Sequence, residues 1–165
     1  MPTPLGATLR GMLAGAVGTA AMDGYWYARV RARGGTASFL SWEFTTPRDW
    51  DAISAPGRLG RRLAEAVTQQ PLDARWAPTT NNVMHWGYGV GAGAAYGIVA
   101  GSLRRRRLVY GVLFGSAVWA ASYVVLPLAG LYKPIWEYDP ATLAIDLGAH
   151  VVYGVAAAGV FAALM

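Results

Sequence analysis

The stretch that decides the fold is LVYGVLFGSAVWAASYVVLPLAGL, residues 108–131, which carries no formally charged side chain. A helix that crosses a bilayer needs roughly 20 predominantly apolar residues, and this stretch is long enough. A helix in the core of a soluble bundle would carry a polar stripe at helical period, and none is present here. Residues 108–131 therefore predict a membrane-spanning helix.

Three further apolar segments flank this one. Residues 83–103 also lack a polar stripe, residues 143–165 are interrupted only by Asp146 and His150, and residues 5–28 contain Arg10 near their start and Asp23 near their end. The sequence thus predicts an all-α integral membrane protein, with four transmembrane helices in a bundle at about 5–28, 83–103, 108–131 and 143–165. At this length we expect a single membrane domain covering residues 1–165.

The composition favours the same class of protein. Hydrophobic residues make up 55% of the chain and charged residues 14%, where a soluble domain carries about 25% charged residues. The absence of cysteine excludes thiolate catalysis and cysteine-based metal sites. The arginines flank apolar segments, which is typical of membrane topology, so we expect a lipid bilayer and no nucleic acid as partner.

The first apolar segment has an alternative interpretation as a cleavable signal peptide. Its apolar run is rich in glycine, which is weak for that role, and Tyr25, Trp26 and Tyr27 follow it directly as interfacial anchors. These features favour a retained helix.

The long connection, residues 29–82, is polar and is expected to carry short amphipathic helices. Between Pro56 and Pro71, the apolar residues Leu59, Leu63 and Val67 are four apart, as on one face of a helix. This helix is expected either to lie on the membrane surface or to pack over the bundle. Thr46 as N-cap and Pro47 as first helical residue predict another short helix.

Charge distribution predicts the orientation. Arg104 to Arg107 fill the short connection between the second and third segments, and short arginine-rich loops stay on the cytoplasmic side. Both termini are then expected in the cytoplasm and residues 29–82 outside. Arg29, Arg31 and Arg33 argue against this orientation, but long loops obey the rule weakly.

Glycines recur at intervals of four in these segments. In a bilayer, small residues at this spacing let helices approach closely, so we expect a tightly packed bundle and a homo-oligomer. The predicted packing residues are Gly89, Gly93, Gly97, Gly101, Gly111 and Gly115.

The chain also contains a short internal similarity. HWGYGV at residues 85–90 and HVVYGV at residues 150–155 share the pattern His-x-x-Tyr-Gly-Val, and Gly18 and Thr19 align with Gly115 and Ser116. Two helical hairpins in tandem, as parallel repeats, would explain this pattern, and chance in a glycine-rich chain explains it equally well.

Four ionisable residues fall at membrane depth, namely Asp23, His85, Asp146 and His150. In an alternating topology they lie near the same interface, and buried ionisable groups in lipid should face inward and pair. We therefore expect one cluster near the outer interface. It could pair the helices structurally, titrate protons or bind a ligand. A zinc site or bis-histidine haem is chemically allowed, without a spacing motif to support it.

Beyond these patterns, the chain resembles the YagU-like family of small bacterial inner-membrane proteins. The resemblance covers the last three apolar segments well, the first loosely and residues 29–82 poorly, and Asp23 has no clear counterpart. It implies the same topology, a bacterial inner-membrane location and a loose link to acid tolerance. The matching residues are Ala14, Gly15, His85, Tyr96, Pro127, Leu128, Gly130, Leu131, Trp136, Asp146 and His150.

The sequence leads to three hypotheses of function. The first is a small polytopic membrane protein that moves or senses protons or a small solute, because histidine changes charge near physiological pH. The second is a non-catalytic subunit that packs into a larger membrane complex, with glycine faces turned outward. The third is a haem- or metal-binding membrane protein. We expect no catalytic residues, no resident cofactor and no metal.

Overall fold

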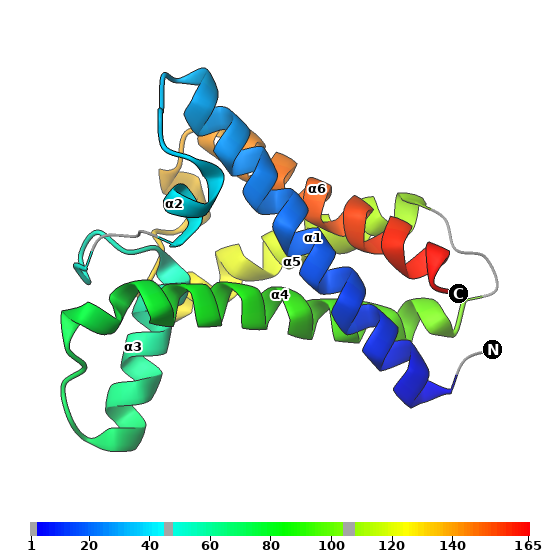
Figure 1. Cartoon of the computed structure of the whole chain (residues 1–165), viewed down its shortest axis with the longest axis horizontal. Helices are drawn as coiled ribbons and strands as arrows, with labels where there is room; N and C mark the ends of the chain where they lie inside the picture. The colour runs from blue at the N-terminus through cyan, green and yellow to red at the C-terminus, as the bar shows by residue number, and fades with distance from the viewer. Residues whose placement is uncertain (1–2, 45–47, 104–107) are drawn as a thin grey trace.

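The computed structural model describes residues 3–44, 48–103 and 108–165, and helices are the regular secondary structure in this part of the chain. These residues form six α-helices and two short 3-10 turns (Figure 1). The elements are α1 (Pro4–Ala32), α2 (Phe39–Phe44), α3 (Ala55–Thr68), η1 (Ala74–Trp76), α4 (Ala77–Gly101), α5 (Leu108–Leu128), η2 (Ile135–Glu137) and α6 (Pro140–Ala163).

Four of these helices are long, and they correspond to the four predicted segments with shifted ends. α1 starts at Pro4, where the Thr3 hydroxyl accepts a hydrogen bond from the Gly6 N–H at 3.1 Å. α6 starts at Pro140, where Asp139 accepts from the Thr142 N–H at 2.9 Å. α4 starts at Ala77 rather than at residue 83, and α5 ends at Leu128 rather than at residue 131. Local capping chemistry sets these ends, and hydropathy alone misses it.

The prediction of an all-α protein with four spanning helices is confirmed in part. Within the described residues, two helices are long and apolar enough to cross a membrane, α5 and α6. α1 and α4 are longer than either, but charged residues in α1 and glycine, asparagine and histidine in α4 lower their hydropathy. Gly and Ala contribute little hydropathy because their side chains are small, and these are the residues that the close helix contacts require.

The long helices pack through backbone contact at glycines. α1 packs against α4 and α6, and α5 packs against α6; the crossing of α1 over α4 is seen in Figure 1. A Cβ added at Gly15 of α1 would lie 2.9 Å from the Cα of Gly93 of α4. A Cβ at Gly154 of α6 would lie 2.6 Å from the backbone nitrogen of Gly115 of α5. Both contacts are too close for any side chain, so glycine is required there.

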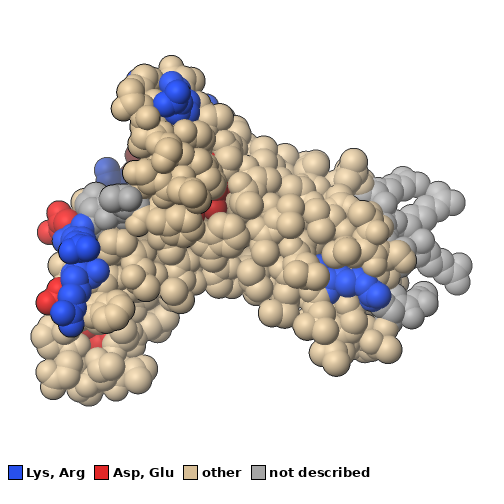
Figure 2. Space-filling view, viewed as in Figure 1, with Lys and Arg blue, Asp and Glu red and all other residues tan. Residues whose placement is uncertain are grey.

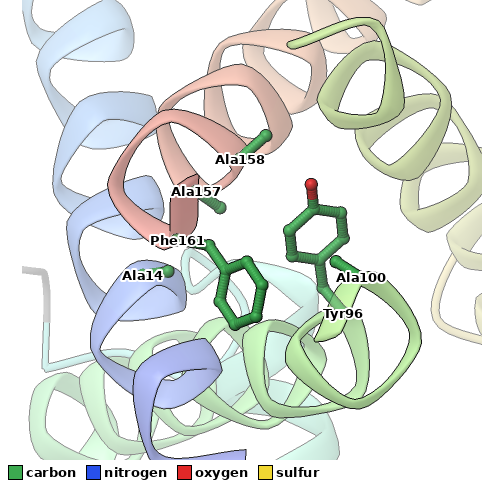
Figure 3. Close-up of a cluster of buried hydrophobic side chains, with 6 residues drawn as sticks. All are labelled: Ala14, Tyr96, Ala100, Ala157, Ala158 and Phe161. Atoms are coloured by element: carbon green, nitrogen blue, oxygen red, sulfur yellow. The ribbon is translucent and has the colours of Figure 1, made fainter. Parts of the chain in front are cut away.

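A small apolar core joins the four long helices near the end where both termini lie (Figures 1 and 3). Phe161 of α6 is fully buried, and its ring lies 5.7 Å from that of Tyr96 of α4. Tyr96 also packs on Phe114 of α5 at 4.8 Å, and Ala14 supplies the α1 side. Aromatic rings thus fill the space between the long helices where these are not in direct glycine contact.

The connection 29–82 carries α2 and α3 at the other end of the bundle. The predicted amphipathic helix is α3, which rests on α4 through Gly57 and Gly60, with Leu63 and Val67 left exposed. Its arginines bind the turn that follows α5, since Arg58 donates to the Leu131 carbonyl at 3.1 Å and Arg62 donates to the Ala129 carbonyl. The Thr46–Pro47 helix start lies outside the described residues, and residues 48–54 form turns.

The surface of the long helices is largely apolar. α5 buries few of its residues, and its exposed side chains include Leu113, Val124 and Leu128. α1 exposes Leu5, Leu9 and Leu13 in a stripe. On the face seen in Figure 2, charged side chains gather at the α2–α3 end and near the N-terminus, with very few between them. The molecule therefore presents an apolar middle between two polar ends.

Candidate functional site

Asp23 and His85 form an ionisable pair between two helices. The close glycine contact of α1 with α4 brings them together, and Asp23 Oδ1 lies 2.8 Å from His85 Nε2. The Asp23 side chain is 5% exposed and the His85 side chain 28%. Water can therefore reach the imidazole while the carboxylate stays buried. The second oxygen, Asp23 Oδ2, is buried with no hydrogen-bond partner among the described residues.

A third ionisable group near this pair is Glu43 of α2, which the sequence analysis did not identify. Glu43 is 9% exposed, and its Oε1 accepts a hydrogen bond from the Trp86 indole at 3.1 Å. The Asn82 side chain donates to the Glu43 backbone carbonyl at 3.4 Å. The signal available in the sequence was weak: a single acidic residue within the short aromatic segment FLSWEF. α2 thus covers the Asp23–His85 pair with a buried acidic side chain.

Asp146 and His150 form a second pair within α6. Their closest side-chain atoms, Asp146 Oδ1 and His150 Nδ1, lie 3.6 Å apart. The imidazole has a better partner in the Asp146 backbone carbonyl, 2.8 Å from His150 Nδ1. A carbonyl only accepts, so Nδ1 carries a proton and donates it. Asp146 Oδ2 is buried without a hydrogen-bond partner in the described part of the chain.

The four residues expected in one cluster are thus arranged as two pairs. α1 presents Asp23 to α4, while α6 is fixed beside them by two tyrosine hydroxyls: Tyr153 donates to the Gly89 carbonyl at 2.7 Å and Tyr25 to the Ile145 carbonyl at 3.2 Å. Across the described ranges, no hydrogen bond or ion pair joins one pair to the other. The same residues contain no group of three histidine or acidic side chains placed to hold a metal ion.

Asp146 also lines a pocket of about 420 Å³. The pocket lies between the second half of α1, the end of α5, the following loop and the start of α6. Four of its nine lining residues are aromatic, and two are arginines from α1. The lining residues are Trp26, Arg29, Arg33, Tyr123, Tyr132, Tyr138, Thr142, Ile145 and Asp146.

The glycines predicted for packing face the inside of the bundle. Gly89, Gly93 and Gly97 contact α1, and Gly111 and Gly115 contact α6. Gly101 is buried at the end of α4. A subunit that packs through these glycines into a larger complex would turn them outward, so these residues serve the contacts within the chain.

Comparisons with known proteins give no relative: the chain matches no family model, no curated protein and no solved structure. The resemblance to the YagU-like family therefore stays a prediction.

Proposed function

We propose that the chain is a small multi-pass membrane protein that binds and releases a proton at the Asp23–His85 pair, and so senses pH or moves protons. The observation that carries this proposal is the 2.8 Å contact between a buried carboxylate of α1 and an imidazole of α4 that water can reach. A buried acid and a histidine in contact share protons readily, and histidine titrates near physiological pH. Near this pair, α1 and α4 touch through glycine and backbone atoms. A change in the charge of Asp23 or His85 therefore acts directly on the contact between the two helices.

The membrane part of this proposal rests on the exposed apolar faces. Soluble proteins rarely expose large contiguous apolar patches, whereas α5 and α6 are apolar on nearly all sides. α1 and α4 are included in our proposed four-helix bundle because α1 packs along both α4 and α6, and because both helices expose apolar side chains, among them Leu9, Leu13 and Ile98. Their ionisable residues, Asp23 and His85, are paired inside, as the low polarity of a bilayer requires.

Location and orientation belong to the proposal as well. We propose the bacterial inner membrane, with both termini in the cytoplasm and residues 29–82 outside. The chain has no cysteine, so single cysteines introduced at Thr3 and Ser38 can be labelled without background. With an impermeant maleimide on intact cells lacking an outer barrier, Ser38→Cys is expected to react and Thr3→Cys to react only after lysis. The opposite pattern would reverse the orientation, and labelling of both in intact cells would contradict a membrane between them.

The proton-binding role is tested on the purified protein in liposomes that contain a pH-sensitive dye. We expect wild-type protein to raise the rate of internal pH change after an external pH step, and Asp23→Asn and His85→Gln to remove that increase. His150→Gln serves as the matched control, since its imidazole lies in the other pair.

Histidine NMR on the same samples distinguishes a protein that senses pH from one that moves protons. If protons are only sensed, liposome flux stays at background, while the His85 imidazole still changes its protonation state as the pH is varied and Asp23→Asn shifts that titration. A His85 signal that does not titrate, together with background flux, would overturn the proposal.

A further inference from the structure

We propose that the pocket around Asp146 binds a small zwitterion, with its ammonium group at Asp146 and the tyrosines and its anionic group at Arg29 and Arg33. This inference goes beyond the proton site, because neither Asp23 nor His85 lines the pocket. At about 420 Å³ the pocket is in the size range of small-molecule sites.

The tyrosines form one continuous aromatic wall. The rings of Tyr123 and Tyr138 lie 5.3 Å apart, those of Tyr123 and Tyr132 lie 5.4 Å apart, and those of Tyr132 and Tyr138 lie 6.1 Å apart. Aromatic faces attract cations through the negative face of the ring, most strongly where water is excluded. Burial beside the Asp146 carboxylate raises the pKa of Tyr132 to about 12, so this phenol stays neutral at physiological pH. The wall therefore offers a cation a polarisable surface without a charge of its own.

Asp146 supplies the negative charge. Its side chain lines the pocket and is 18% exposed, and its Oδ1 lies 3.6 Å from His150 Nδ1. A carboxylate in the pocket wall attracts a ligand ammonium group that lies against the tyrosines.

Arg29 and Arg33 supply the positive charge. Arg29 lies over the Tyr25 ring, with its guanidinium carbon 5.7 Å from the ring centre, and Arg33 is exposed at the end of α1. Within the described ranges neither forms an ion pair with Asp146. Two guanidinium groups are a good partner for a phosphate or a carboxylate.

A ligand needs both a positive and a negative group to match the charged residues of this pocket. A simple cation would be attracted by Asp146 but repelled by the two arginines, and a simple anion would be attracted by the arginines but repelled by Asp146. A short molecule with both groups matches all three residues. Ethanolamine phosphate has this chemistry, either as a free solute or as the headgroup of a phospholipid, whose acyl chains would lie on the apolar faces of α5 and α6.

The test measures binding by the full chain in detergent, using calorimetry with phosphoethanolamine, inorganic phosphate and ethylamine as probes. We expect phosphoethanolamine to bind more tightly than either half. Asp146→Asn should weaken the binding of phosphoethanolamine and of ethylamine at least about tenfold, the loss expected for one charge-assisted hydrogen bond. The binding of phosphate should stay unchanged. The double variant Arg29→Gln, Arg33→Gln should weaken the binding of phosphoethanolamine and of phosphate. Arg31→Gln, on the same helix, is the matched control outside the pocket.

A second measurement separates the two sources of the ligand. Native mass spectrometry of protein extracted from phosphatidylethanolamine or phosphatidylglycerol bilayers reports the retained lipid. Selective retention of phosphatidylethanolamine, lost in the arginine variant, supports the lipid source, and binding of soluble phosphoethanolamine alone supports a free solute. The proposal is overturned if neither the soluble zwitterion nor the lipid binds selectively. It is also overturned if the arginine variant, with thermal unfolding matched to the wild type, binds phosphoethanolamine as the wild type does.

Discussion

Gly93 of α4 lies against Gly15 of α1 so closely that a Cβ added at Gly93 would be 2.7 Å from the Gly15 backbone nitrogen. This contact brings Asp23 within hydrogen-bond distance of His85 and so fixes the geometry of the proposed proton site. The spacing of the two helices and the chemistry of the site are therefore coupled.

Replacing Gly93 with alanine is expected to push α1 and α4 apart. Forced overpacking costs about 1–3 kcal/mol, which we expect as a loss of thermal stability in detergent. Gly91→Ala is the matched control, because a Cβ at Gly91 meets nothing within 4 Å and alanine favours the helix. Equal stability of the two variants would contradict the close contact.

The second hairpin should respond in the same way. Gly154 of α6 meets Gly115 of α5, as Gly89 of α4 meets Thr19 of α1, so the glycine of each His-x-x-Tyr-Gly-Val segment touches the first helix of its own hairpin. Gly154→Ala is expected to destabilise the protein, while Gly159→Ala, whose Cβ would make an ordinary 3.8 Å contact with Leu108, should not. Thermal unfolding of both variants in the same detergent tests this difference.

Much of this arrangement follows from local sequence patterns. The glycine spacing predicted which faces of the helices meet. The pairing within α6 follows from the i, i+4 spacing of Asp146 and His150.

Other features have no local signal. Position along a helix predicts the depth of Asp23 and His85 but not which neighbour each one faces, so one expected cluster became two pairs. The buried Glu43 depends on how α2 folds back over α4, and the short aromatic segment that carries it gives little sign of burial. Of the four predicted spans, α5 and α6 are long and apolar enough to cross a membrane, and in α4 the glycines that permit close packing lower the hydropathy.

The Asp23–His85 contact should show strong energetic coupling. We expect Asp23→Leu and His85→Leu each to destabilise the protein, because each leaves a polar partner unpaired, with the larger loss for His85→Leu since Asp23 is the more buried group. The double variant should lose less unfolding free energy than the two single variants lose together, with a coupling energy of about 1–3 kcal/mol. A double-mutant cycle from denaturant unfolding in detergent measures this value, and strict additivity would argue against a direct interaction.

Asp139 should make the start of α6 sensitive to acid. Hydrogen bonds from the Thr142 hydroxyl and the Thr142 N–H lower the pKa of the Asp139 carboxyl below its ordinary value of 3.8. A lowered pKa in the folded state means that the ionised cap stabilises the helix above the ordinary value, and that this stabilisation is lost as pH falls through the lowered pKa.

Amide exchange at Thr142 measures the effect of this cap. Asp139→Asn keeps an acceptor but carries no charge, so we expect faster exchange than in the wild type at neutral pH and no difference in strong acid, once intrinsic exchange rates are corrected. A difference that persists unchanged into strong acid would show that the charge is not the cause.

The end of α5 depends on one glycine with a backbone conformation that other residues avoid. Gly130 has φ of +63°, and it ends the helix with hydrogen bonds from the Gly130 N–H to the Pro127 carbonyl at 2.8 Å and from the Leu131 N–H to the Leu126 carbonyl at 2.9 Å. A Cβ at Gly130 would meet nothing within 4 Å, so the cost of Gly130→Ala is purely conformational, about 1–2 kcal/mol. Gly130→Asn should cost less, because asparagine tolerates this conformation.

The same glycine directs the chain into the pocket, since Leu131 is buried and Tyr132 follows it directly. Gly130→Ala is therefore expected to weaken phosphoethanolamine binding as well as thermal stability, with Gly130→Asn intermediate in both measurements. Gly91→Ala, on the open face of α4, should change neither. A variant at position 130 that loses stability but binds phosphoethanolamine as tightly as the wild type would mean that the helix end does not position the tyrosine wall.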